Sequence, residues 1–298
     1  MLLVVALAPG QAIASDPIRF APLPLEDPKI IHEQFGGLMD FLQQQTGLTL
    51  RWTPFADYLD ILTAFRRGEL DLAYLGPLPY VILRRDDPAA RSLACFRDAD
   101  GAAAYTCSMV AFAGSGVDLA QLDGRRIGLT QPFSTCGYLA VSEMLSRAGT
   151  SLEQDGVRYD YAGSHSRAAL GVVRGDYDLA GVKTSIAHRY THLNLDIVAE
   201  SRPYPGFTLV ANTETLGEHE LDLLARALAR LDPDLNPGYA GLTAGWGKQI
   251  ENGTVPPERC DYSGIRTTLE QLPWPIPDTG GKDPGSGPPG SDRAGPGP

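Results

Sequence analysis

The chain of 298 residues is 43% hydrophobic and carries a formal net charge of −11. Its length and apolar fraction suffice for two ordinary domains, and no internal apolar run approaches the roughly 20 residues of a membrane-spanning helix. The acidic balance argues against a nucleic-acid partner, which needs a basic face, and it means that any anion site has to be built locally.

The N-terminus carries part of the pattern of an export signal. Residues 2–8 form a short apolar run, and residues 12–14 have the small-x-small pattern that signal peptidase cuts. No Lys or Arg precedes the run, so an apolar N-terminal strand is the alternative. We interpret residues 1–14 as the remnant of a signal peptide, which predicts a periplasmic or otherwise extracytoplasmic protein.

Strands and helices alternate from Ile18 onwards. Apolar residues at helical spacing predict a helix over residues 30–47, and Asp57 is expected to cap a second helix that ends at Arg67. The other elements expected in this part are strands at residues 18–21, 48–52, 70–75 and 105–112, and a helical stretch from Pro77. This alternation predicts a mostly parallel sheet flanked by helices.

A second series of the same kind follows. Its expected strands are residues 126–129, 157–161 and 209–212, and its expected helices are residues 134–148, 165–174 and 218–231. The run Arg-Gly-Glu-Leu-Asp-Leu-Ala at residues 67–73 has a counterpart, Arg-Gly-Asp-Tyr-Asp-Leu-Ala, at residues 174–180. Chance and common loop chemistry could produce this echo, but we interpret it as the mark of two lobes of similar α/β build.

The predicted molecule is therefore two-lobed. Residues 15–108 and 208–272 are assigned to the first lobe and residues 109–207 to the second, so the chain crosses between the lobes twice. Two such crossings form a hinge that can close over a ligand. Gly and Pro dominate residues 273–298, and this tail is expected to be disordered.

The cysteines do not form a disulfide scaffold, because there are four of them in a long chain. Cys95 and Cys107 flank a turn at residues 97–101 and could face each other across a hairpin. Export would permit a bridge, although the geometry must also allow it. Cys95–Cys107 is a candidate pair on these grounds.

The most informative segment is the Ser-Thr-Cys-Gly sequence that follows a strand and opens a helix. The N–H groups of a first helical turn have no intrahelical partners, and the helix dipole adds about half a positive charge there. Ser134 and Thr135 add hydroxyl donors, and Gly137 would let a ligand approach the backbone closely. The combination suits an anion, although Ser134 could serve only as a helix cap.

Two more helix starts carry polar groups. His165 lies in the first turn of one helix, Tyr58 opens another, and Tyr105 precedes the strand expected to cross between the lobes. In α/β proteins, ligands lie beyond the carboxyl ends of the strands, where helix N-termini gather. Each residue could instead be a packing residue or a cap. Together they predict a cleft in which neutral donors from both lobes hold a small oxyanion, with little fixed positive charge.

These motifs occur in an order that resembles the phosphate, phosphite and phosphonate-binding proteins of ABC transporters. The likeness covers about residues 17–215 and consists of Asp57-Tyr58, the run from Leu70 to Pro77, Tyr105, Ser134 to Gly137, and Gly163-Ser164-His165. The resemblance implies the type II periplasmic binding protein fold and delivery of the ligand to an ABC permease. It also implies that the phosphoryl oxygens are held by Tyr58, Tyr105, Ser134, Thr135 and His165.

The sequence departs from the family pattern in two respects. The family members that bind aminoalkylphosphonates hold the amine with carboxylates, and the nearest positions here are Ser185 and Phe207, which makes an aminoethylphosphonate ligand doubtful. Cys136 stands where the family usually has a serine. With Cys107 it is similar to a branch that senses arsenic oxyanions by docking on the extracellular domain of a sensor kinase, although Cys136 could act through its backbone N–H alone.

A Cys/His hydrolase is a further alternative. Cys136 and His165 could form a nucleophile–base pair, with Asp178 orienting the imidazole. The sequence has no Gly-x-Ser-x-Gly elbow, no Walker loop and no His-Glu-x-x-His motif. We therefore expect a binding protein rather than an enzyme, with neither a cofactor nor a metal ion.

Overall fold

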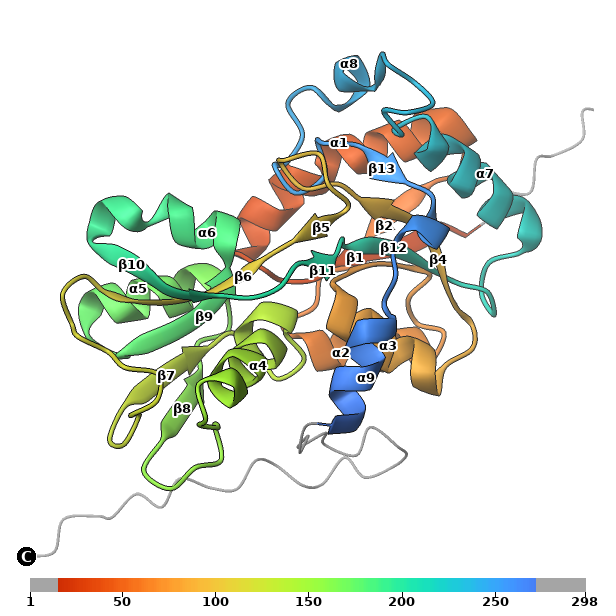
Figure 1. The fold of residues 1–298 in the computed structure, drawn as a ribbon. Helices are drawn as coiled ribbons and strands as arrows, with labels where there is room; N and C mark the ends of the chain where they lie inside the picture. Colours follow the sequence, from red (N-terminus) through yellow and green to blue (C-terminus); the bar gives the residue numbers. More distant parts are fainter. Residues whose placement is uncertain (1–15, 272–298) are drawn as a thin grey trace, which may run out of the picture.

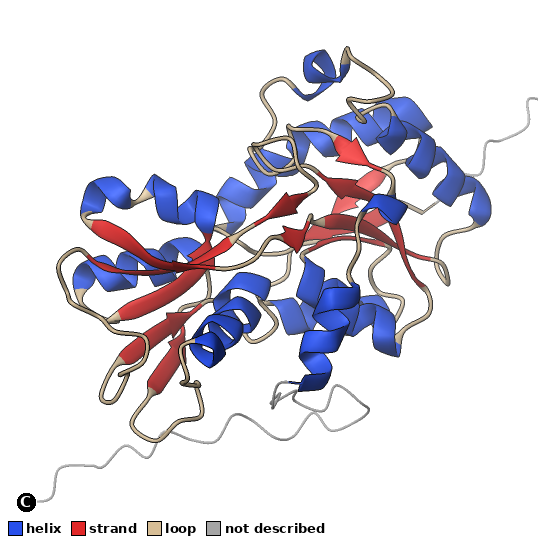
Figure 2. Cartoon of the chain, viewed as in Figure 1, coloured by secondary structure: helices blue, strands red, loops and turns tan. Residues whose placement is uncertain are grey.

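The computed structural model describes residues 16–271 (Figure 1). The predicted signal peptide remnant, residues 1–14, and the predicted tail, residues 273–298, lie outside the described residues. The described chain forms two lobes, each a sheet flanked by helices, as Figure 2 shows. Within the described residues, no helix is both long and apolar enough to cross a lipid bilayer.

The first lobe contains a six-stranded sheet in the order β13-β4-β12-β3-β1-β2. Its strands are β1 (Ile18–Pro22), β2 (Leu50–Trp52), β3 (Leu72–Leu75), β4 (Ala90–Phe96), β12 (Thr208–Asn212) and β13 (Thr254–Val255). β1 runs parallel to β2 and β3, whereas β12 runs antiparallel to β3 and β4.

The second lobe contains a five-stranded sheet in the order β10-β6-β9-β7-β8. Its strands are β6 (Cys107–Phe112), β7 (Arg126–Leu129), β8 (Arg158–Tyr161), β9 (Leu179–Lys183) and β10 (Leu195–Glu200). Between the lobes, β5 (Ala104–Tyr105) pairs antiparallel with β11 (Tyr204–Pro205), and these two short strands carry the two crossings (Figure 1). Because β6 begins at Cys107, the chain enters the second sheet slightly before residue 109.

The sheets are mixed rather than mostly parallel, and the crossings explain the difference. The series β1–α1–β2–α2–β3 gives parallel neighbours, as the alternation of strands and helices predicts. The strands next to the hinge do not follow this pattern. β6 enters the second lobe antiparallel to β9, and β12 returns to the first lobe antiparallel to β3. Strand-and-helix alternation therefore indicates the α/β class but not the direction of strands that arrive from the other lobe.

The helices cover the faces of both sheets. They are α1 (Pro28–Thr46), α2 (Tyr58–Arg66), α3 (Pro77–Asp86), α4 (Ala140–Arg147), α5 (His165–Arg174), α6 (Thr184–Arg189), α7 (Glu218–Ala229), α8 (Tyr239–Thr243) and α9 (Ser263–Gln271), together with the short η1 (Thr135–Leu139), η2 (Thr191–Leu193) and η3 (Pro257–Arg259). α1 buries Ile31, Phe35 and Leu38 at helical spacing and ends at Gly47, whose φ of 71° favours glycine.

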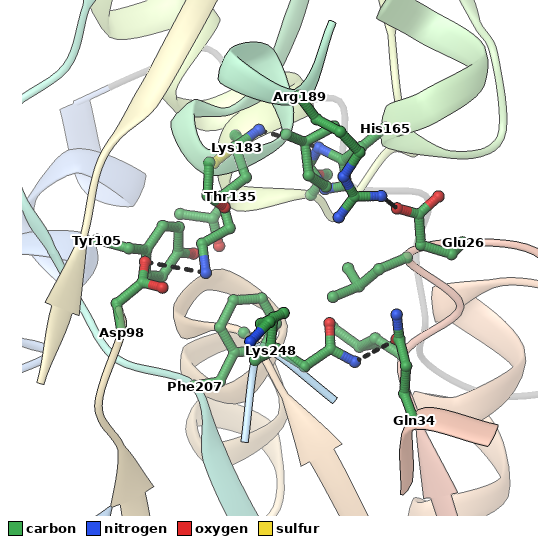
Figure 3. A pocket seen from close by; sticks show the side chains of 18 of the residues that line it. Glu26, Gln34, Asp98, Tyr105, Thr135, His165, Lys183, Arg189, Phe207 and Lys248 are labelled. Atoms are coloured by element: carbon green, nitrogen blue, oxygen red, sulfur yellow. Dashed lines mark hydrogen bonds and ion pairs between the residues drawn. The ribbon is translucent and has the colours of Figure 1, made fainter. Parts of the chain in front are cut away.

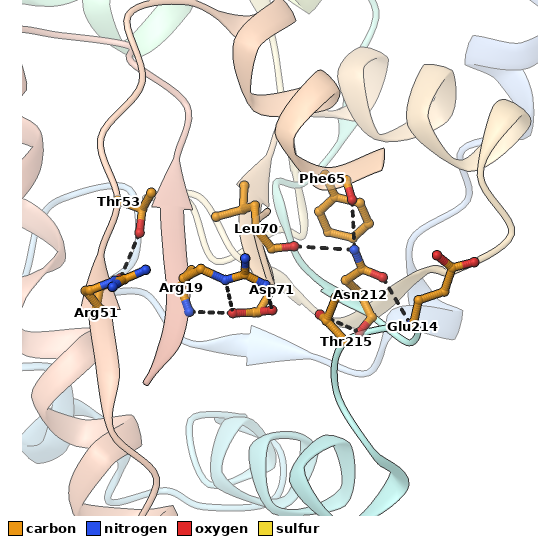
Figure 4. Close-up of polar contacts among 9 residues, drawn as sticks. All are labelled: Arg19, Arg51, Thr53, Phe65, Leu70, Asp71, Asn212, Glu214 and Thr215. Carbon is orange, nitrogen blue, oxygen red and sulfur yellow. Dashed lines mark hydrogen bonds and ion pairs between the residues drawn. The ribbon is translucent and has the colours of Figure 1, made fainter. Parts of the chain in front are cut away.

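An ion pair joins β1 to β3 at the amino-terminal ends of these strands (Figure 4). The Arg19 guanidinium donates to both carboxylate oxygens of Asp71, over 2.7 and 2.5 Å, and the Arg19 backbone N–H donates to the same side chain. Nearby, the Asn212 side chain donates to the Phe65 carbonyl over 2.8 Å, which ties β12 to the end of α2. These contacts link β1 to the start of β3 and β12 to α2, and none of the four residues lines the cleft.

The disulfide candidate Cys95–Cys107 is wrong. Cys95 is bonded to Cys260, and Cys107 is bonded to Cys136, with Cα–Cα distances of 6.5 and 5.0 Å. Cys95 lies in β4 of the first sheet and Cys107 in β6 of the second, so the turn between them does not close a hairpin. The cysteine partners are set by the tertiary structure, since the two bridges join residues 165 and 29 positions apart.

Candidate functional site

A cleft of about 370 Å³ lies between the two lobes. Its walls include the first residues of α2 and α3 from the first lobe, and of η1 and α5 from the second. These helices begin where strands of the two sheets end, which is where ligands bind in α/β proteins. The volume falls within the usual range for small-molecule sites, about 300–1,000 Å³.

Six of the seven site residues predicted from the sequence line this one cleft. They are Tyr58, Tyr105, Ser134, Thr135, Cys136 and His165. Figure 3 shows Tyr105, Thr135 and His165 around the same space. The seventh, Gly137, is not among the lining residues. The helix starts of opposite lobes therefore converge, as their positions in the sequence suggested.

Gly137 has a packing role. A Cβ atom at this position would lie 1.9 Å from the Thr130 hydroxyl oxygen and 2.6 Å from the Thr130 backbone nitrogen. The Gly137 N–H is also taken, since it donates to the Ser134 hydroxyl oxygen over 3.0 Å. Gly137 thus lets η1 pack closely against the end of β7, while the first N–H groups of η1, at Thr135 and Cys136, have no intrahelical acceptor.

Two buried phenols face the hydroxyls of the Ser-Thr segment. Burial raises the pKa of Tyr58, and a hydrogen bond with Ser134 opposes part of the rise. Burial likewise raises the pKa of Tyr105, and a hydrogen bond with Thr135 opposes it. Both phenols are therefore neutral at physiological pH, and each keeps a proton that it can donate.

His165 is held as a neutral imidazole. The backbone N–H of Lys183 donates to His165 Nδ1 over 3.1 Å, so the proton of the neutral ring is on Nε2. Burial, with a smaller contribution from the Lys183 charge, lowers the pKa of His165 to about 3. The imidazole thus supplies one N–H donor and no positive charge.

Two hydrogen-bonded contacts connect the lobes beside the cleft. Gln131, after β7, accepts from the Tyr58 backbone N–H over 2.9 Å and donates to the Gly163 carbonyl over 2.8 Å. The Thr135 hydroxyl oxygen accepts from the Leu78 N–H in the first turn of α3 over 3.1 Å. Because this oxygen already accepts a bond, its own proton is free to point elsewhere.

Sequence reasoning missed Asp98, Lys183 and Arg189 as charges of the cleft; for Glu26 the sequence left two interpretations open, that its Leu-Glu-Asp-Pro stretch lines the cleft or that it simply turns the chain. Lys183 Nζ lies 3.0 Å from an Asp98 carboxylate oxygen, and Arg189 Nη1 lies 2.8 Å from a Glu26 carboxylate oxygen. All four residues line the cleft, with one pair on each side of it (Figure 3). The expectation of little fixed positive charge is therefore wrong, although each cation has an acidic partner.

Among the three charged residues that were missed, only one had a usable signal in the sequence. Lys183 is the last residue of β9, and a polar residue at the carboxyl end of a strand is a candidate site residue. Asp98 lies in a loop, and Arg189 ends α6, a helix that the sequence patterns did not indicate.

Phe207 and Ser185 also line the cleft. The Phe207 ring stacks on Tyr74 at a centroid distance of 5.2 Å and contacts the Tyr105 ring at 5.3 Å. This aromatic group forms an apolar wall next to the hinge.

The geometry does not support the nucleophile–base alternative. The Cys136 sulfur is bonded to Cys107, His165 Nδ1 accepts from the backbone, and Asp178 pairs with Arg125 at 3.2 Å. No group of three or more potential metal-ligating side chains occurs within residues 16–271.

Comparison with known proteins gives a consistent picture. The family model described as “ABC transporter, phosphonate, periplasmic substrate-binding protein” matches residues 20–262. The phosphate-import protein PhnD of Mycolicibacterium smegmatis is 25% identical over 270 residues, which cover 84% of each chain.

Solved structures share the fold at lower identity. PhnD1 from Prochlorococcus marinus, in complex with methylphosphonate, has a TM-score of 0.71 and 19% identity over 85% of this chain and 97% of its own. A binding component of an ABC phosphonate transporter from Pseudomonas aeruginosa has a TM-score of 0.71 and 20% identity over 86% of each chain. The two-lobed architecture is thus that of type II periplasmic binding proteins.

Proposed function

Because this chain belongs to the periplasmic substrate-binding proteins of phosphonate ABC transporters, we propose that its cleft binds a small tetrahedral phosphorus oxyanion: phosphate, phosphite or an alkylphosphonate. The bound ligand is then delivered to an ABC permease. Membership of this family implies an extracytoplasmic location, and we propose that this location is the periplasm.

The observation that carries the proposal is the convergence of neutral donors from both lobes. Tyr58 and Tyr105 offer phenols, His165 offers its Nε2–H, and η1 offers hydroxyls and free backbone N–H groups. Hydrogen bonds to an ionised oxygen are roughly twice as strong as neutral ones, and they gain strength when closure excludes water. Donors on both lobes also make closure favourable only when the anion is present.

The arsenic-sensor alternative is not favoured. It would need Cys107 or Cys136 as a free thiol, but the two sulfurs are bonded to each other. The matching family is defined by transport, not by docking on a kinase.

Isothermal titration with phosphate, phosphite, methylphosphonate, arsenate and arsenite tests the proposal. We expect a phosphorus oxyanion to bind and the Thr135→Ala variant to bind it about 10–100-fold more weakly, the loss expected for one hydrogen bond to a charged group. Thr267→Ala, an exposed threonine of α9 outside the cleft, is the matched control and should bind normally. If none of the five anions binds, the proposed function is wrong; if arsenite alone binds, the sensor alternative replaces it.

A further inference from the structure

Two carboxylates line a cleft that otherwise suits an anion, and this requires an explanation. Among the described residues that line the cleft, Glu26 and Asp98 are the acidic ones. An acidic side chain in a ligand cleft repels an anion unless a cation neutralises it. That cation belongs either to the ligand or to the protein itself, and the contacts of the two carboxylates distinguish these cases.

Glu26 is fully engaged by the second lobe. One carboxylate oxygen pairs with Arg189 Nη1 at 2.8 Å, and the other accepts a hydrogen bond from the Ser166 hydroxyl. Its side chain is 6% exposed. A ligand amine would have to compete with the arginine for this buried carboxylate, because both of its oxygens are already engaged.

Asp98 is engaged in the same way on the hinge side. One of its oxygens pairs with Lys183 Nζ at 3.0 Å, and the other accepts from the Ala99 backbone N–H at 3.0 Å. The lysine is also held by rings, since Nζ lies 5.0 Å from the Tyr105 centroid and 5.7 Å from that of Phe207. Its side chain is 12% exposed, so the ammonium has little water to return to.

The cleft as a whole favours a ligand without positive charge. Its described lining includes three cations, Lys183, Arg189 and Lys248, against the two acids. Its volume of about 370 Å³ is far above the roughly 10–15 Å³ that one water requires, which leaves space beside a bare oxyanion. Apolar side chains, Phe207 and Ile186, line part of that space.

We propose that the ligand is a phosphorus oxyanion whose substituent is small and uncharged, an inference that rests on the proposed function. Arg189 and Lys183 are the specificity residues, because they occupy the two carboxylates that could otherwise recruit an ammonium group. The site would then distinguish an alkylphosphonate from an aminoalkylphosphonate by a charge pair within the protein.

A gain-of-binding experiment tests this inference. Methylphosphonate and 2-aminoethylphosphonate are titrated against the wild-type protein and the Arg189→Met variant, which keeps an unbranched apolar stem but removes the guanidinium and so frees Glu26. We expect the wild-type protein to prefer methylphosphonate at least ten-fold, and Arg189→Met to shift the ratio about ten-fold towards 2-aminoethylphosphonate. Adding Glu26→Gln to Arg189→Met should remove the shift. Arg174 forms an exposed ion pair with Asp176, and the control variant Arg174→Met should not shift the ratio.

The Lys183→Met variant gives a second reading, because it frees Asp98 while leaving the backbone N–H that orients His165. It should shift the ratio in the same direction. Equal affinity of the wild-type protein for both phosphonates, or an unchanged ratio in both variants that free a carboxylate, would overturn the inference while leaving the proposed function intact. Failure of the wild-type protein to bind methylphosphonate, phosphate or phosphite would instead remove the proposed function.

Discussion

The backbone N–H of Lys183 donates a hydrogen bond to Nδ1 of His165 over 3.1 Å, and it joins the last residue of β9 to the first residue of α5. The bond fixes the tautomer of the imidazole, so Nε2–H is the donor that remains. The Lys183 side chain meanwhile pairs with Asp98 on the hinge side of the cleft. One residue therefore orients a neutral donor through its backbone and neutralises an acid through its side chain.

Acid should destabilise the protein through His165. Its pKa is lowered to about 3 in the folded state from an ordinary value of 6.5, so the unfolded chain binds more protons between these values. The stability that this neutral, buried ring provides is complete above about pH 6.5 and is lost as the pH falls towards 3. Going from about pH 7.5 to about pH 5 should cost roughly 2 kcal/mol at this site.

Urea denaturation of the wild-type protein and of His165→Gln at the two pH values measures this effect. The variant should lose about 2 kcal/mol less than the wild-type protein on acidification. His219→Gln, at an exposed position of α7, should behave as the wild-type protein does. An identical acid response in His165→Gln would contradict the assignment of a neutral histidine.

The Cys107–Cys136 disulfide should position the oxyanion site. It links the residue two places after Tyr105 to the residue directly after Thr135, and these two side chains are hydrogen-bonded to each other. Replacing both cysteines by serine should weaken methylphosphonate binding about ten-fold, because the segment that carries Thr135 would no longer be covalently held to β6, the strand that follows the hinge.

The second disulfide is a control for the loss of a bridge. Cys95 and Cys260 lie outside the cleft lining, so Cys95→Ser/Cys260→Ser should lower the unfolding free energy by about 2–5 kcal/mol without changing affinity. Equal affinities of the two double variants, measured by calorimetry below their melting temperatures, would show that the Cys107–Cys136 bridge is only structural.

Gly137→Ala should disturb the start of η1. Its added methyl group would meet the Thr130 hydroxyl and backbone, so η1 would have to move away from β7. Overpacking of this kind costs about 1–3 kcal/mol, and the movement should also weaken oxyanion binding. Gly36→Ala is the opposite case, because nothing lies within 4 Å of its added Cβ inside helix α1, and it should raise stability by about 0.5–1 kcal/mol. Thermal unfolding with and without methylphosphonate tests the predicted loss of stability in Gly137→Ala and the predicted gain in Gly36→Ala. A Gly137→Ala protein with normal stability and affinity would refute the packing role.

Asp71 should stabilise the first lobe without affecting the affinity for the ligand. Burial alone would raise the pKa of Asp71, but hydrogen bonds and charge from Arg19 outweigh it, and the pKa lies below its ordinary value. Its contribution is therefore present above an unfolded-state pKa of about 3.9 and is lost as the pH falls through the lower folded value. Asp71→Asn should cost about 1–3 kcal/mol near neutral pH and progressively less in acid.

Chemical denaturation at several pH values, combined with titration of methylphosphonate, checks this separation. Affinity should be unchanged because Asp71 lies outside the cleft lining. Asp222→Asn removes an exposed pair with Arg226 on α7 and should cost less than 1 kcal/mol. A pH-independent cost for Asp71→Asn would exclude the proposed role of its charge.

The local part of this structure was determined by the sequence. Helix α5 spans residues 165–174 as its apolar spacing predicts, and α2 begins directly after Asp57, whose side chain accepts from the Asp60 N–H. Caps, stops and periodicity act over a few residues, so they can be identified without knowing the fold. The helix starts that bear Tyr58, Ser134 and His165 could be found for this reason.

Only the tertiary structure decided which of these parts meet and what else joins them. Glu26 and Arg189 are 163 positions apart, and the cysteine partners come from strands and helices of different sequence regions. Such contacts depend on how two sheets and a hinge bring distant loops together, and no local sequence pattern encodes which distant segments meet. The close approach that requires glycine at residue 137 is likewise a tertiary contact, because it is made by Thr130, which follows β7.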